Sequence, residues 1–115
     1  MKETTGNVVL YKAPDGSISL YVKLRDETGW LSLNQMGDLF GRDKSVISRH
    51  LRNVYATGEL ERKATVAFFA TVQDEGDRIV TRQVEYFNLD AILSVGYRVN
   101  SQRGTQFRIW ATKVP

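Results

Sequence analysis

The sequence predicts an α+β domain whose elements follow the order ββ-αα-ββ-αα, with a helix-turn-helix core, two β-hairpins and two C-terminal helices. Three observations predict this class. Two runs of strand-type residues are each centred on a turn, two pairs of segments have helical periodicity, and strands do not alternate regularly with helices as in a doubly wound sheet. With 115 residues, of which 42% are hydrophobic, the chain can bury one core. We therefore expect a single domain over residues 1–115.

The first hairpin is predicted within "NVVLYKAPDGSISLYVKLR". Pro14-Asp15-Gly16 is suited to its turn, because proline presets φ and glycine accepts positive φ. The residues that follow alternate between apolar and polar, as in a strand with one buried face. The apolar set is Ile18, Leu20, Val22 and Leu24. "DETG" then ends the pattern.

Helical periodicity begins after Trp30. Ser32 and Gln35 have the spacing of a capping box, and Gly41 is suited to end the helix. Its predicted apolar face consists of Leu33, Met36, Leu39 and Phe40.

A second helix should follow the glycine turn. Asp43 is a good N-cap residue, and Thr57-Gly58 should end the helix. The predicted buried stripe is Ile47, Leu51 and Val54.

Strand character returns in the segment "ATVAFFATVQDEGDRIVTRQVEYFNL", around the acidic loop 74–77. The strand from Val66 to Val72 is apolar on nearly both faces, so we expect one side to pack on the helices. Two helices should then close the domain, with Asn88 and Ser101 as caps and Pro115 as the end. Their predicted apolar faces are Leu89, Ile92, Leu93 and Gly96, and Phe107, Trp110, Ala111 and Val114. The core is expected to include Leu39, Ile47, Leu51, Phe107 and Trp110.

Composition excludes several classes of function. The chain has no cysteine and only one histidine, His50, so we expect neither a disulfide framework, a metal site nor a cofactor. The sequence contains no apolar run of about 18 residues and no apolar leader at its start, so we expect no membrane partner and a cytoplasmic location.

Charge is unevenly distributed along the chain. The net charge is +3, and two basic zones, residues 42–63 and the segment after Asp90, flank the acidic second hairpin. This layout suits a polyanion that touches two places. A solvated surface without a ligand is the alternative.

The segment "GRDKSVISRHLR" indicates a recognition helix. If Ile47 and Leu51 point inward, the outward face carries residue types that read base edges or bind phosphate. This face consists of Lys44, Ser45, Ser48, Arg49 and Arg52. Free amides at the start of the helix should add affinity for phosphate. An amphipathic helix with a basic solvated face is the alternative, and His50 is expected to be partly packed.

The C-terminal segment "GYRVNSQRGTQFRIWAT" closely resembles the central signature of the RhuM family of bacterial virulence-associated proteins. Together with "GWLSLNQMGDLFGRDKSVISRHLRNVY", the resemblance covers essentially the whole chain. The order of elements is more distantly similar to the Bro-N domain of phage antirepressors. That resemblance implies duplex DNA binding by an N-terminal domain of a longer, phage-derived protein. It also implies a C-terminal region as a further partner, and a homodimer is left open. The acidic loop 74–77 departs from what a phosphate-contacting wing would carry.

Two arginines in this signature have two interpretations. Arg98 and Arg103 lie at a predicted helix–helix corner among several polar residues, which suits contacts to phosphate. Alternatively, they bond backbone carbonyls or an acid such as Glu85 and are structural.

Two other classes of function compete with DNA binding. A protein-interaction module would use the Phe68 and Phe69 region or the edge of the first hairpin. An enzyme is not expected, because His50 has no acid partner at a suitable spacing and the acids at 74–77 lie on a predicted hairpin tip.

Overall fold

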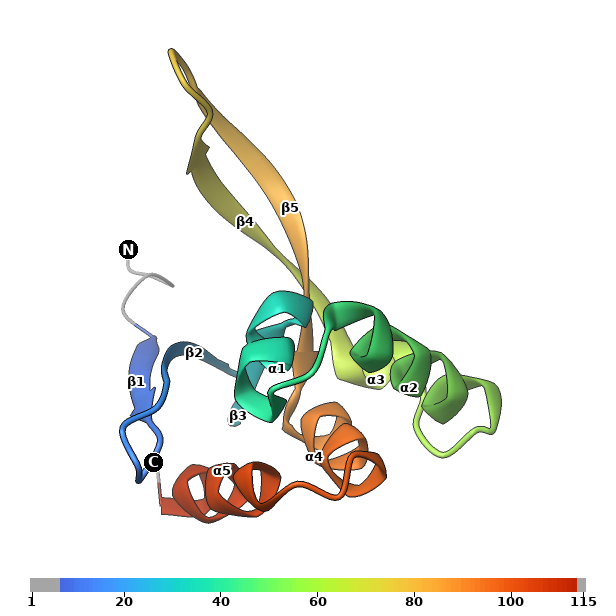
Figure 1. The fold of residues 1–115 in the computed structure, drawn as a ribbon. Coiled ribbons are helices and arrows are strands. Elements are labelled where there is room, and N and C mark those ends of the chain that lie inside the picture. Colours follow the sequence, from blue (N-terminus) through green and yellow to red (C-terminus); the bar gives the residue numbers. More distant parts are fainter. Residues whose placement is uncertain (1–6, 114–115) are drawn as a thin grey trace.

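The computed structural model describes residues 7–113 and has the predicted α+β class (Figure 1). Three strands come first, followed by two helices and one further helical turn, two long strands and two closing helices. Their bounds are β1 Val8–Lys12, β2 Ser19–Arg25, β3 Thr28–Ser32, α1 Leu33–Phe40, α2 Lys44–Ala56, α3 Arg62–Thr65, β4 Val66–Asp74, β5 Ile79–Asn88, α4 Leu89–Arg98 and α5 Gln102–Lys113.

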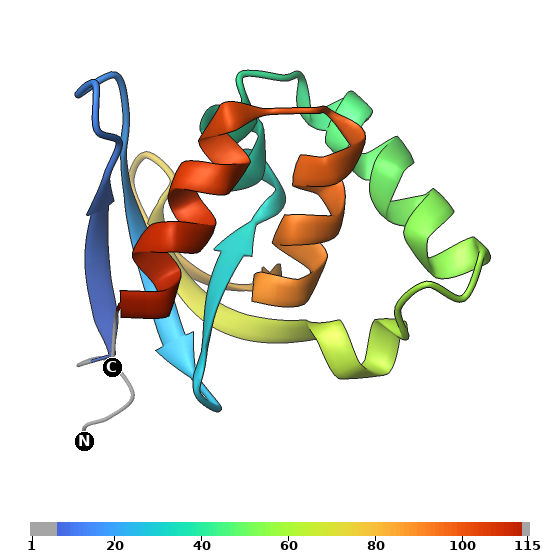
Figure 2. The ribbon, with the colours of Figure 1, turned by 90° about the horizontal axis from the view of Figure 1, so that it is seen from below.

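All five strands form one antiparallel sheet in the order β1-β2-β3-β5-β4. The two predicted hairpins, β1–β2 and β4–β5, are therefore joined through β3. Side chains on one face of this sheet meet the helices in a single core, with the helices stacked beside the strands (Figure 2). The strand residues in this core include Tyr11, Leu20, Val22, Leu31 and Phe87.

The predicted apolar faces of α1 and α2 are buried except for half-buried Leu33, whereas Leu89, Leu93 and Ala111 of the closing helices are only half-buried. Leu39, Ile47 and Phe107 are each 0% exposed, and Leu51 and Val54 join them below the surface. Trp110 is only partly buried, so its predicted place in the core is correct only in part. Val114 and Pro115, which the sequence assigned to the end of the last helix, lie outside the described residues.

Strand β3 and helix α3 were not predicted. β3 follows a two-residue turn in which Asp26 and Glu27 have φ of 55° and 62°, and the register pairs Arg25 with Thr28. Such tight turns normally contain Asn or Asp followed by Gly, because other residues resist positive φ. The usual hairpin signal is therefore missing from the sequence. The single turn of α3 is too short to show a helical period.

The β4–β5 hairpin forms an arm that extends beyond the helices (Figure 1). The sequence predicted that one side of the strand from Val66 to Val72, now part of β4, packs on the helices. This prediction is wrong for most of the length of that strand. Only its first residue, Val66, packs against the core, while the side chain of Phe69 lies on the opposite face against Trp30 and Tyr86. The helices end short of the arm and leave its outer half uncovered.

A contact between α1 and the two closing helices fixes their packing. The ring of Phe40, which is 3% exposed, lies against Gly96 in α4 and Gly104 in α5. A Cβ atom built on Gly104 would lie 3.2 Å from Phe40 Cε1 and 3.4 Å from the Gly96 Cα. Both glycines are therefore needed for close approach, and α1 is held where α4 meets α5.

Three aromatic rings join the first strand to the last helix. Tyr11 lies edge-on to Phe107 and to Trp110, with 5.0 Å between ring centroids in each pair. Because Phe107 is fully buried and Trp110 is only partly covered, the two residues should contribute unequally to stability.

We predict that Phe107→Ala lowers the free energy of unfolding by about 3–5 kcal/mol, the range for a fully buried aromatic. Trp110→Ala should lower it by clearly less, because part of the indole is already in contact with water. Urea denaturation monitored by far-ultraviolet circular dichroism measures both. Equal losses for the two variants would contradict the packing described here.

Candidate nucleic-acid interface

Helix α2 presents the predicted residues on its outward side. Its N-cap is Asp43, as the sequence predicts, and its buried stripe is Ile47, Leu51 and Val54. Opposite this stripe, positions 45, 48, 49 and 52 have the i, i+3, i+4, i+7 spacing that places them on one side of a helix. Lys44, Ser45, Arg49 and Arg52 are exposed, and Ser48 is half-buried.

Hydrogen bonds to the N-cap residue Asp43 already occupy polar groups at the start of α2. The Asp43 carboxylate accepts hydrogen bonds from the Ser45 amide and the Ser45 hydroxyl, and these bonds lower the pKa of Asp43. The amides of Val46 and Ile47 donate to the Asp43 carbonyl. The expectation that amides at the start of α2 are free for phosphate is therefore wrong for Ser45 to Ile47, because Asp43 takes that role.

The turn between α1 and α2 is close-packed. Gly41 has φ of 66° and ends α1, as the sequence predicts. A Cβ atom built on Gly37 would lie 2.9 Å from the Arg42 carbonyl oxygen, so a side chain at position 37 would force the turn open. The two glycines thus allow α2 to begin close to the end of α1.

A group of cationic side chains surrounds His50 on the flank of α2. Burial, and then the positive charges of Arg49, Arg98 and Arg42, lower the pKa of His50. Arg49 belongs to α2, Arg42 to the turn and Arg98 to α4, so three segments of the chain contribute to one positive field. We call Arg42, Arg49 and Arg98 the arginine cluster.

Each of the two signature arginines has a partner within the protein. Arg98 forms an ion pair with Glu59 at 2.8 Å, and Glu59 also accepts a hydrogen bond from Ser94. These bonds from Arg98 and Ser94 lower the pKa of Glu59. Arg103 donates from Nη1 to the Asp38 and Leu39 carbonyls, both at 3.4 Å. These are contacts of the structural alternative, although the acid is Glu59 and not Glu85. A role in binding phosphate stays a prediction.

Arg42 was not among the predicted site residues. Its Nη2 donates to the Val99 carbonyl at the end of α4, while Arg103 donates in the reverse direction to the end of α1. The two arginines thereby connect the α1–α2 turn to the α4–α5 corner. The position of Arg42 beside the Asp43 cap is visible in the sequence, but its partner is 57 residues away and could not be inferred locally.

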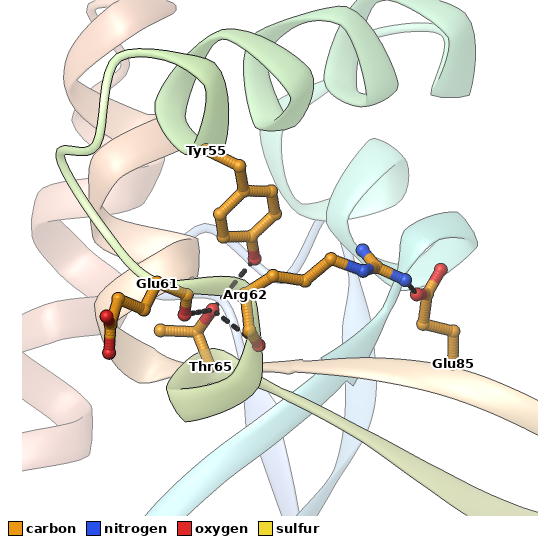
Figure 3. Close-up of polar contacts among 5 residues, drawn as sticks. All are labelled: Tyr55, Glu61, Arg62, Thr65 and Glu85. Carbon is orange, nitrogen blue, oxygen red and sulfur yellow. Dashed lines mark hydrogen bonds and ion pairs between the residues drawn. The ribbon is translucent and has the colours of Figure 1, made fainter.

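The C-terminal end of α2 holds the base of the arm (Figure 3). The Thr65 hydroxyl donates to the Glu61 carbonyl, so the Tyr55 hydroxyl, 2.9 Å away, is the donor to Thr65. Arg62 forms an ion pair with Glu85 of β5. The arm and α2 are therefore fixed relative to each other, and an open groove separates the start of α2 from β5. Lys44, Ser45 and Ser48 line this groove together with Val84 and Glu85.

The tip of the arm is acidic. Arg82 makes a bidentate ion pair with Glu75, at 2.8 and 2.9 Å, and Gly76 has φ of 79° in the loop that joins the strands. Asp74 and Asp77 lie at the same end. The positive field therefore lies at α2 and the α4–α5 corner, and the negative charge lies at the far end of the arm.

Two structural findings bear on other classes of site. Among residues 7–113, no three side chains of the types that ligate metals come together. In the same residues, no helix combines the length and apolar character needed to cross a bilayer.

Fold and surface together define an α+β domain in which one antiparallel sheet packs against the helices and extends into the β4–β5 arm. The family model described as "Virulence protein RhuM family" matches residues 64–114, which confirms the RhuM resemblance over this part of the chain. No curated protein and no solved structure matches the chain significantly. The match covers β4, β5, α4 and α5 but not α2.

We predict that Arg103→Gln lowers the free energy of unfolding by about 1 kcal/mol, because the carbonyls at the end of α1 lose a charged donor. Arg103→Lys should restore part of this loss, because both carbonyls bond the single Nη1 nitrogen and an ammonium group has three N–H donors. Thermal melts measure both variants, and Arg108→Gln on the exposed side of α5 is the control. Unchanged melting of Arg103→Gln would contradict the structural role.

Proposed function

We propose that this domain binds duplex DNA, with α1 and α2 acting as a helix-turn-helix and α2 lying in the major groove. The observation that carries the proposal is the outward face of α2, with Ser45, Ser48, Arg49 and Arg52 on one side of a helix whose opposite side is buried. Arginine forms bidentate contacts with guanine, and serine bonds either bases or phosphate. The proposal assigns no catalytic residue.

The turn geometry supports this function. Helix-turn-helix motifs join two helices by a short turn that often contains glycine, so that the first helix braces the second. Here Gly37 and Gly41 allow that close approach, and the α4–α5 corner supports the turn through Arg42 and Arg103. The orientation of helix α2, whose outward face would meet DNA, is consequently fixed.

Electrostatics support one orientation of the duplex. The arginine cluster lies on the flank of α2, where phosphates beside the groove would pass, while Asp74 and Asp77 at the arm tip would repel phosphate. We therefore place the duplex along α2 and away from the tip. As the Bro-N resemblance implies, we propose that the domain serves as the N-terminal part of a longer virulence-associated or phage-derived protein.

A protein-interaction module is the second candidate. The observation that favours it is the exposed apolar surface of the arm, where Phe68 is 57% and Val72 is 68% exposed. Binding to unrelated duplexes separates the two functions. Phosphate contacts release counterions and weaken steeply with salt, and apolar docking does not.

We predict that Arg49→Ala weakens binding to a selected duplex by about 1–3 kcal/mol and relaxes discrimination at one base position. Fluorescence anisotropy on a set of single-base variants measures both effects. Arg108→Ala, which removes the same charge from exposed α5, is the matched control and should leave discrimination unchanged. Absence of any duplex affinity in the unmodified protein at low salt would overturn the proposal.

We also predict that duplex DNA raises the pKa of His50. In the free protein, burial and the arginine cluster lower it, and phosphate beside the cluster would offset those positive charges. The complex then binds a proton more readily than the free domain, so affinity should increase as the pH falls through the pKa of the bound state.

Nuclear magnetic resonance titration can follow this change without ambiguity, because His50 is the single histidine of the chain. Arg49→Ala is the electrostatic control and should raise the pKa of His50 in the free protein. An unchanged His50 titration in the presence of saturating duplex would place the DNA elsewhere on the domain.

A further inference from the structure

The outer edge of the sheet is unprotected along β4. This strand is the last in the order β1-β2-β3-β5-β4, and its nine residues pair with β5 in an uninterrupted register. Edge strands usually carry lysine, proline or a bulge, which prevent pairing with another chain. From Val66 to Gln73 the sequence "VAFFATVQ" contains no charged residue and no proline. The edge therefore offers a row of backbone groups to a further strand.

We propose that β4 pairs antiparallel with β4 of a second copy of this chain, which joins two five-stranded sheets across a two-fold axis. The proposal does not depend on DNA binding, because it uses a different part of the domain. It gives the homodimer, which the sequence leaves open, a defined interface.

Symmetry limits the register of this pairing. In an antiparallel pair related by a two-fold axis, one residue lies opposite its own equivalent. When this residue is Ala70, all nine residues of β4 pair. Phe68 then lies opposite Val72 of the second copy, and the same contact repeats on the other side of the axis.

These pairs would bring the exposed apolar side chains of the two copies into lateral contact. Phe68 and Val72 are 57% and 68% exposed in the single chain. They lie on the same face of the arm, because side chains at even spacing along a strand point to the same side. Cross-strand pairs between an aromatic and a β-branched residue stabilise sheets. Ala70 at the axis leaves room for the two rings beside it.

The charges at the two ends of β4 are also self-complementary. Exposed Lys63 precedes the strand, and Asp74 and Asp77 follow at the tip, where Glu75 is already paired with Arg82. Antiparallel pairing brings the base of each arm beside the tip of the other, so opposite charges meet at both ends. The apolar and charged side chains of β4 are thus complementary to those of the same strand in antiparallel orientation. This favours a second copy of the chain over an unrelated peptide.

A cysteine placed at the axis tests the register directly. Opposite Cα atoms of an antiparallel pair lie about 4.5–5.5 Å apart, within the range that a disulfide spans. Because the chain has no native cysteine, Ala70→Cys should form a covalent dimer under mild oxidation. Gln83→Cys is the matched control on β5, because Gln83 lies opposite Ala70 in the sheet. Its two copies would lie about 14 Å apart, at three strand spacings, and should not cross-link.

Sedimentation velocity tests the surface without cross-linking. The unmodified chain should show a concentration-dependent dimer, and Val72→Lys should abolish it while retaining the circular dichroism spectrum of the folded protein. Ile79→Lys is the control, because Ile79 is 72% exposed on the same arm but lies on β5. It should weaken the dimer far less.

Three results would overturn the proposal. These are an unmodified chain that stays monomeric at millimolar concentration, an Ala70→Cys chain that does not cross-link, and a dimer that Val72→Lys leaves intact. If a synthetic β4 peptide binds the edge while the chain remains monomeric, the edge serves another partner and the proposal fails as well.

Discussion

Contact of the Phe40 ring with two helical glycines is the constraint on which the rest of the structure depends. Gly96 and Gly104 bring α4 and α5 close together, and the end of α1 occupies the space that their missing side chains leave. This position allows Arg103 to reach the last carbonyls of α1 and Arg42 to reach the end of α4. The orientation of α2 follows, because α2 begins only a short turn beyond Phe40. A surface that reads DNA would therefore be set by the apolar packing where α1 meets α4 and α5.

Local signals in the sequence predicted most of the elements, and nonlocal contacts account for what was missed. The caps at Ser32, Asp43 and Asn88 and the buried stripe of α2 were all predicted, because each depends on residues within one or two turns. Strand β3 was missed because its turn uses Asp26 and Glu27 at positive φ, where the expected glycine is absent. The apolar character of β4 was misinterpreted as burial, since periodicity cannot show how far a strand extends beyond the core.

The candidate interface could be predicted as a set of residue types but not as a geometry. Positions 45, 48, 49 and 52 follow from helical spacing alone. In contrast, the ion pair between Arg98 and Glu59 joins residues 39 positions apart, and no pattern in the sequence connects them. The same holds for the positive field around His50, to which α2, α4 and the intervening turn all contribute. Charge counts indicated two basic zones, and folding brings part of each to the same flank of α2.

The strand order has a consequence for how far this domain can be divided. β3 lies between β2 and β5, so the sheet interleaves the N-terminal strands with the segment that the RhuM model covers. A fragment starting at residue 64 would lack both the strand beside β5 and the ring that fills the space between α4 and α5. The family signature and the folding unit thus have different boundaries. Recombination at the edge of the signature would separate parts of one core.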